Sequence, residues 1–136
     1  MRAVIDTNIF LVSISRKSPY HWIFIELMTG SYTLCVSNEI VFEYEEIITQ
    51  HMGREVSDAI KNFLLESPHI EMTYVYFNWN LLKDQDDNKF SDCYLASGSD
   101  FLVTHDKGFD KLSTISFPKF NIVTALEFKK ILGAFQ

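Results

Sequence analysis

Two aspartates of this 136-residue chain follow short apolar segments, at positions from which they could bind a metal ion together. Asp6 follows the β-branched segment Ala3–Ile5, and Asp106 comes shortly after the segment Phe101–Thr104. If these segments are neighbouring parallel strands, both carboxylates lie at the sheet edge where functional groups gather. Their repulsion would then require a cation, and hard oxygen ligands favour Mg²⁺ or Mn²⁺. An aspartate after a strand is more commonly a helix N-cap, and this alternative stays open for each residue taken alone.

A glutamate on a predicted helix is a further candidate ligand. Residues 38–50 carry apolar side chains at helical spacing, and the expected buried stripe consists of Ile40, Tyr44 and Ile47. At about 100° per residue, Glu43 lies roughly 40° from Ile47, whereas the other glutamates of this segment point further away. Glu43 is therefore the acid best placed to face inward, although a solvated position at the edge of the stripe fits the same periodicity.

Four aspartates lie between residues 84 and 92, more than helix capping requires. A helix is expected over residues 87–98, and its dipole favours one acid at its start without any further role. Asp87 and Asp92 are about 140° apart on a regular helix, so both reach one site only if Asp87 projects from the N-cap position.

These acids require a fold that brings the ends of separate strands together. Apolar segments predict five strands, near residues 3–5, 33–36, 70–75, 101–104 and 121–123. Helical spacing predicts helices over residues 19–29, 38–50, 55–66 and 87–98, and a capping box at Thr124 opens a last helix that ends at Gly133. Strands that alternate with helices predict a parallel sheet covered on both faces, a three-layer α/β/α domain over residues 1–136. The stretch 78–86 is expected to be irregular.

The bulk properties fit one folded unit in the cytoplasm. The chain is 47% apolar, and we expect a single core, no membrane-spanning segment and no secretory signal. Cys35 and Cys93 lack metal-binding spacing and are expected to be reduced core thiols. The net charge is −6, and seven of the nine aspartates fall between Asp84 and Asp110. Binding of nucleic acid through phosphate neutralisation alone would require a basic stripe instead.

The four acidic segments, taken in order, resemble the PIN-domain family. The resemblance rests on Val4–Asn8, Ser37–Tyr44, Asp84–Asp92 and Leu102–Asp106, spans nearly the whole chain, and is closest to the VapC-like toxins of bacterial toxin–antitoxin systems. It implies a five-stranded parallel sheet, metal-dependent cleavage of RNA and a cognate antitoxin as partner. The family's four acids map onto Asp6, Glu43, Asp87 and Asp106, with Asp86 and Asp92 as alternatives for the third. Its small hydroxyl residues map onto Thr7 and Thr104.

A cluster of this kind could hold one or two Mg²⁺ or Mn²⁺ ions and position a water for in-line attack on an RNA phosphodiester. Asp6, Glu43 and Asp106 are the expected ligands, and Asp87 or Asp92 would complete the site or act as the base. The alternative is a non-catalytic domain that keeps the fold and binds a protein or RNA.

Other side chains have two interpretations each. Lys89 and Lys107 could steer the RNA backbone or be ordinary surface lysines, and His105 fits a loop histidine better than a general base. The aromatic stretch Tyr74–Trp79 could stack on RNA bases, but alternating aromatics favour a place in the core. The C-terminal apolar residues could cover the sheet or form a homodimer; they are Phe128, Ile131, Leu132 and Phe135.

Overall fold

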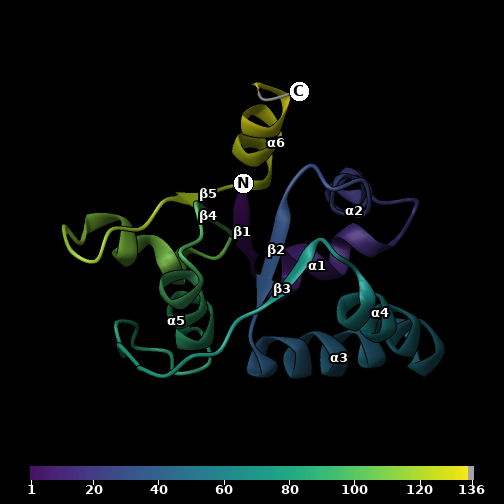
Figure 1. Cartoon of the computed structure of the whole chain (residues 1–136), viewed down its shortest axis with the longest axis horizontal. Coiled ribbons are helices and arrows are strands. Elements are labelled where there is room, and N and C mark those ends of the chain that lie inside the picture. Colours follow the sequence, from purple (N-terminus) through teal and green to yellow (C-terminus); the bar gives the residue numbers. More distant parts are fainter. Residues whose placement is uncertain (135–136) are drawn as a thin grey trace.

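A computed structural model describes residues 1–134 and contains a five-stranded parallel sheet between helices (Figure 1). The spatial order is β3-β2-β1-β4-β5, and each neighbouring pair is parallel. The strands are β1 (Arg2–Ile5), β2 (Thr33–Val36), β3 (Ile70–Met72), β4 (Phe101–Val103) and β5 (Ile122–Val123). The predicted fold class is therefore confirmed. β1 to β3 follow one another toward one edge of the sheet, and β4 and β5 lie on the other side of β1. In open parallel sheets, ligands bind at the carboxyl ends of the strands beside such a change of direction, here β1, β2 and β4.

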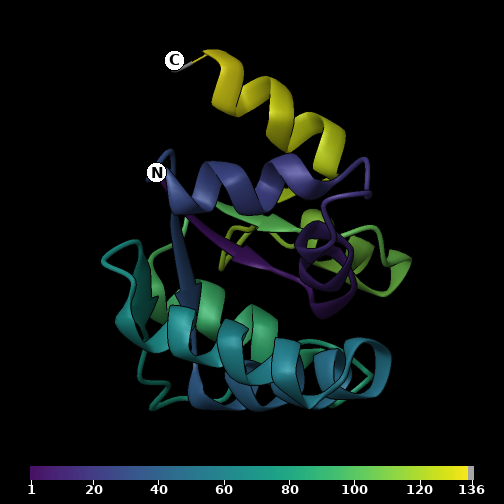
Figure 2. The same ribbon diagram turned by 90° about the vertical axis from the view of Figure 1, so that its right-hand side faces the viewer.

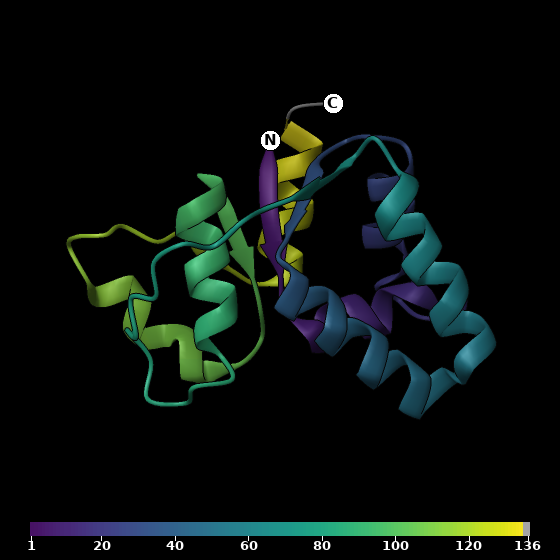
Figure 3. The same ribbon diagram turned by 60° about the horizontal axis from the view of Figure 1, so that its bottom comes forward.

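Helices cover both faces of the sheet. The helices α1 to α4 lie on one side, and α5 with the 3₁₀ helix η1 lies on the other (Figures 1 and 3). The last helix, α6, packs over α2 (Figure 2). Their bounds are α1 (Thr7–Ile14), α2 (His21–Met28), α3 (Asn38–Met52), α4 (Arg54–Glu66), α5 (Asn88–Ser97), η1 (Lys107–Thr114) and α6 (Ala125–Ala134). None of the helices within residues 1–134 is both long and apolar enough to cross a bilayer.

The helix α3 shows how local sequence sets the geometry of the site. Ser37 caps it, because its hydroxyl accepts a hydrogen bond from the Ile40 N–H at 3.3 Å. The buried stripe is Ile40, Val41, Tyr44 and Ile48. Ile47, expected in that stripe, is only half-buried, so the helix is rotated slightly from the predicted orientation. Gly53 ends the helix with a φ of 92°, a conformation that favours glycine, and α4 starts immediately afterwards.

The prediction that the aromatic stretch after β3 lies in the core is wrong. β3 ends at Met72, and after the bond from Thr73 N–H to the Val36 carbonyl the chain leaves the sheet. Tyr74, Tyr76 and Phe77 are exposed as a result. β3 is the edge strand on this side, so no neighbouring strand holds the chain in the sheet beyond that point.

The apolar residues of the C-terminal helix pack into the core beside α2. Phe128 is fully buried, with its ring 5.0 Å from that of Tyr32 and 6.2 Å from that of Trp22, and Leu132 is buried too. Phe135 lies outside the described residues. Cys35 and Cys93 are buried free thiols, and burial raises the pKa of Cys93 to about 12.

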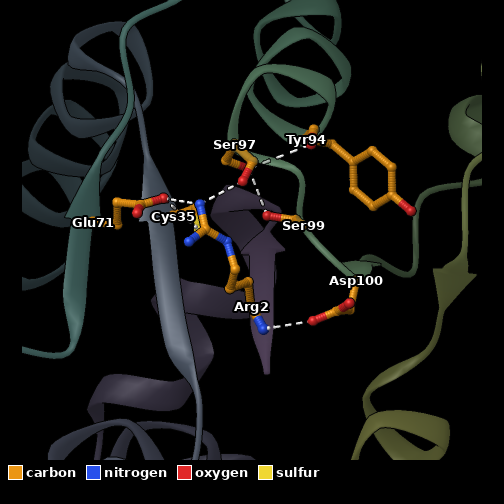
Figure 4. Close-up of polar contacts among 7 residues, drawn as sticks. All are labelled: Arg2, Cys35, Glu71, Tyr94, Ser97, Ser99 and Asp100. Atoms are coloured by element: carbon orange, nitrogen blue, oxygen red, sulfur yellow. Dashed lines mark hydrogen bonds and ion pairs between the residues drawn. The ribbon is translucent and has the colours of Figure 1, made fainter.

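A polar network holds the amino ends of the strands (Figure 4). The Arg2 guanidinium bridges the Glu71 carboxylate on β3 and the Ser97 carbonyl at the end of α5. The Arg2 N–H donates to Asp100 at 2.9 Å, just before β4. Because this network ties β1 to β3 and β4 at the edge opposite the acids, we assign it to the stability of the sheet.

Candidate functional site

Asp6 stands where β1 becomes α1, and it is 7% exposed. Although it occupies the N-cap position, its side chain makes no capping hydrogen bond. Its Oδ2 instead accepts a hydrogen bond of 2.8 Å from the Thr104 hydroxyl, and that hydroxyl also accepts the Asp106 N–H at 3.0 Å. Thr104 therefore links the two strand ends that carry Asp6 and Asp106. The helix-cap explanation of Asp6 does not account for this arrangement.

Glu43 reaches the same region from the second turn of α3. One carboxylate oxygen accepts a hydrogen bond from the Thr7 hydroxyl at the start of α1. The other forms an ion pair of 2.7 Å with the Lys89 ammonium, which comes from the first turn of α5. Both side chains of the pair are largely buried, since their exposed fractions are 15% for Lys89 and 24% for Glu43. The pair therefore holds α3 and α5 together across the crevice.

Asp87 and Asp106 approach each other over Gly108. A Cβ atom added to Gly108 would lie 3.2 Å from Asp106 Oδ1 and 3.4 Å from Asp87 Oδ2, so both carboxylates border one small space. Asp87 is the N-cap residue of α5 and, like Asp6, makes no side-chain capping bond. Asp106 does cap, because its Oδ1 accepts the Gly108 N–H at 2.8 Å. Glycine leaves the space between the two acids open.

The four acids act on one another electrostatically, and we call Asp6, Glu43, Asp87 and Asp106 the acidic quartet. The pKa of Asp87 is raised to about 6, first by burial and then by the charges of Asp84 and the other three members. Burial also raises the pKa of Asp6, with added contributions from Asp106 and Glu43, while the Thr104 hydrogen bond opposes the rise. The charges of Asp6, Glu43 and Asp106 thus all act on Asp87, and that the four acids share one site stays a prediction.

The structure places Asp92 differently. Its Oδ1 accepts a hydrogen bond of 3.0 Å from the Trp79 N–H, in the irregular segment after β3. Burial raises its pKa, and the carboxylate that adds to this rise is Glu39 rather than a quartet member. The exposed Asp86 lines a cavity with Glu43 and Lys89. Metal binding by Asp92 or Asp86 stays a prediction.

Several residues that shape the site carried only weak sequence signals. The buried Asn88 side chain accepts the Leu82 N–H at 2.9 Å and donates to the Leu82 carbonyl at 3.1 Å, which fixes the loop before α5. The buried Tyr44 hydroxyl donates to the Ile5 carbonyl, next to Asp6. His105 Nε2 accepts the Ala125 N–H at 3.1 Å, so this nitrogen serves the start of α6. Among these residues, Tyr44 carried a signal in the sequence, because it is a polar side chain within the apolar stripe of its helix.

The donor set of the quartet fits a hard divalent cation. All four side chains offer carboxylate oxygens, and neighbouring carboxylates add to the burial that raises the pKa of Asp6 and of Asp87. Within residues 1–134, no three histidine, cysteine, aspartate or glutamate side chains form a group that could hold an ion as they are placed. Ion binding by the quartet would therefore need these side chains to move, and Glu43 would have to leave Lys89.

Two open cavities give access to the quartet. One, of about 370 Å³, reaches Asp6 and Asp106 beside Tyr20, and the other, of about 460 Å³, reaches Glu43 beside Phe42.

Comparison with known proteins agrees with the fold. The family model described as the PIN domain matches residues 2–108. The structure of VapBC2 from Rickettsia felis, bound to a DNA fragment from its promoter, aligns with a TM-score of 0.62 at 15% identity and covers 91% of this chain and 98% of that chain. VapC20 from Mycobacterium tuberculosis, a toxin that cleaves the sarcin–ricin loop, aligns with a TM-score of 0.60 at 13% identity. The alignment covers 79% of this chain and 92% of that chain. No curated protein shows significant similarity to the sequence.

Proposed function

Because this chain belongs to the PIN domain family, we propose that it is a cytoplasmic, metal-dependent endoribonuclease and the toxin of a toxin–antitoxin pair. The observation that carries the proposal is the shared electrostatics of the quartet. Asp6, Glu43 and Asp106 come from three separate segments, and all three raise the pKa of Asp87. Asp6 and Asp87 make no side-chain capping bond, and carboxylates of raised pKa beside other acids are typical of a site built for a cation.

The quartet would hold one or two divalent cations, with Mg²⁺ or Mn²⁺ preferred by its oxygen donors. A bound cation would supply positive charge to the phosphate oxygens and lower the pKa of water for attack on phosphorus. Thr104 and Thr7 orient the carboxylates of Asp6 and Glu43 through their hydrogen bonds. These bonds restrict the two carboxylates before substrate arrives, and Glu43 would still have to leave Lys89 for an ion to bind.

Two further side chains would take part in the reaction, one as a proton acceptor and one as a hydrogen-bond donor to the phosphate. Asp87, whose pKa of about 6 is near neutral pH, is the quartet carboxylate suited to accept a proton from the attacking water. Lys89, once released from Glu43, can donate to a phosphate oxygen of the RNA backbone. No covalent intermediate with the protein is required.

The test is incubation of the purified protein with a mixed RNA pool in Mn²⁺, in Mg²⁺ and in EDTA. We expect cleavage products in at least one metal and none in EDTA. Asp58→Asn is the matched control, because this exposed aspartate of α4 lies outside the quartet and should leave cleavage unchanged. If every RNA stays intact in both metals while the protein is folded, the non-catalytic alternative replaces the nuclease.

The proposed partner is a cognate antitoxin. VapBC2 and VapC20 are toxin-system proteins whose fold this chain shares, and a nuclease acting on cellular RNA needs restraint. Co-expression with the product of an adjacent gene should give a stable complex that lacks RNA cleavage. Recovery of two independent proteins would contradict this part of the proposal.

A further inference from the structure

Lys89 is a largely buried lysine in the first turn of α5. Its side chain is only 15% exposed, although lysine is among the residue types that are rarely buried. The positive end of the helix dipole also disfavours a cation at this position. The Lys89 ammonium lies 2.7 Å from a Glu43 carboxylate oxygen, and this ion pair offsets both costs. The partner on α3, rather than the helix that carries it, therefore explains the placement of Lys89.

This ion pair occupies a glutamate that the proposed metal site needs. One Glu43 oxygen faces the Lys89 ammonium and the other accepts the Thr7 hydroxyl, so both oxygens are engaged. An ammonium and a divalent cation repel each other strongly at contact distance. A cation that binds Glu43 therefore has to displace the Lys89 ammonium, and the displaced ammonium needs a new partner.

A second glutamate lies one helical turn from Glu43. Glu39 precedes Glu43 by four residues on α3, so the two side chains are neighbours on one helix face, with Cβ atoms about 5–6 Å apart. Lys89 lines two cavities together with Glu39. One has a volume of about 190 Å³, and the other, of about 460 Å³, is also lined by Glu43. Both glutamates thus belong to the immediate surroundings of Lys89.

The surroundings of Glu39 favour an added positive charge. Asp92 is 5% exposed and lines the smaller cavity with Glu39. The charge of Glu39 adds to the burial that raises the pKa of Asp92, so the two carboxylates disfavour each other's ionisation. Among the described residues that line this cavity, Lys89 is the one basic side chain. An ammonium placed between Glu39 and Asp92 would relieve their repulsion.

We propose that Lys89 is a movable counter-ion, which pairs with Glu43 in the metal-free protein and with Glu39 when a divalent cation occupies Glu43 and no RNA is bound. The proposal rests on the metal-dependent function above. Lys89 is then a positioning residue, because it acts on ion binding through Glu43. It keeps Glu43 compensated without an ion and lowers the apparent affinity for the ion by the fraction of protein in which the pair is closed.

The first test measures ion affinity without RNA. Calorimetry with Mn²⁺ compares the wild type with Lys89→Met, which keeps a long side chain but removes its charge. The variant should bind Mn²⁺ roughly tenfold more tightly or better, because no ammonium competes for Glu43. Lys61→Met is the matched control, since Lys61 forms an ion pair of 3.3 Å with Glu45 of the same helix, outside the quartet. It should keep the wild-type affinity.

The second test locates Lys89 in the wild type and so does not depend on the folding of any variant. NMR of protein with ¹³C-labelled lysine measures nuclear Overhauser contacts of the Lys89 ε-methylene protons. We expect contacts with the Glu43 γ protons in EDTA and with the Glu39 γ protons in saturating Mg²⁺. Contacts of Lys61 with Glu45 should be the same in both conditions.

The third test asks whether Glu39 receives the ammonium. Glu39→Gln removes one negative charge, which weakens Mn²⁺ binding to some extent in any background. It should weaken binding more in the wild type than in Lys89→Met, because the ammonium needs Glu39 only when Lys89 is present. The difference between the two backgrounds isolates this coupling.

Equal Mn²⁺ affinity of the wild type and Lys89→Met overturns the proposal and leaves the metal site standing. Persistence of the contact between Lys89 and Glu43 in saturating Mg²⁺ does the same. An equal effect of Glu39→Gln in both backgrounds overturns Glu39 as the second partner. If neither the wild type nor Lys89→Met binds Mn²⁺ although both are folded, the metal-dependent function and the proposal fail together.

Discussion

Asp87 is the residue whose protonation should be measurable without any metal. Its pKa of about 6 in the folded protein lies above the ordinary value of 3.8, so the folded state binds this proton more tightly than the unfolded state. The stabilisation that this proton gives is complete below pH 3.8, the pKa of Asp87 in the unfolded state, and it is lost as the pH rises through about 6. The metal-free protein should therefore become more stable as the pH falls from 7 to 5, by about 1 kcal/mol once solvent screening of this half-buried group is allowed for.

Asp87→Asn provides the control for that experiment. The variant has no proton to bind at this position, so its stability should depend much less on pH between 7 and 5. Urea unfolding of both proteins with EDTA at four pH values measures the difference. Parallel pH profiles for the variant and the wild type would show that Asp87 does not titrate in this range.

Gly108 tests whether the space between Asp87 and Asp106 matters. In Gly108→Ala, the new Cβ would lie 3.2 Å from one carboxylate oxygen and 3.4 Å from the other, and it must push at least one of them aside. We expect Mn²⁺ affinity to fall severalfold, measured by calorimetry, with a change in unfolding free energy below about 1 kcal/mol. Gly133→Ala is the matched control, since nothing lies within 4 Å of its added Cβ. Unchanged Mn²⁺ affinity in Gly108→Ala would mean that the ion does not bind between these acids.

At the scale of elements, the irregular segment between β3 and α5 depends on few anchors. Asp92 accepts the Trp79 N–H, and Asn88 holds Leu82. Asp92→Ala should therefore loosen the segment and speed hydrogen exchange at the Trp79 amide, whereas exchange in β1 stays slow. Exchange rates measured by NMR test this expectation. Equal protection of the Trp79 amide in both proteins would show that Asp92 does not anchor this segment.

The elements also show which features a sequence can predict. β1 followed by Asp6, and α3 with an inward Glu43, depend on local signals: apolar runs, a serine cap and helical periodicity. The parallel arrangement of the sheet followed from the alternation of strands with helices. By contrast, the exposure of the aromatics after β3 depends on where an edge strand stops pairing, and no local signal marks that point. The Glu43–Lys89 pair joins two helices that are distant in sequence, so spacing along one helix could not predict it.

At the scale of the whole molecule, the proposed function would bring an RNA phosphate to an acidic region of an acidic protein. The chain has 18 acidic and 12 basic residues, and the charges of Asp84, Asp106, Asp6 and Glu43 all act on Asp87. A bound divalent cation would offset part of this charge locally, which resolves the apparent conflict between an acidic protein and a polyanionic substrate.

The most direct test of this account is RNA cleavage by Asp6→Asn at saturating Mn²⁺, measured together with the melting temperature of the metal-free protein. The substitution keeps the shape of the side chain and its hydrogen bond with Thr104 but removes one charge from the quartet. The account predicts that cleavage falls by about two orders of magnitude or more, while the metal-free melting temperature stays equal or rises because repulsion is relieved. Cleavage at the wild-type rate would contradict it.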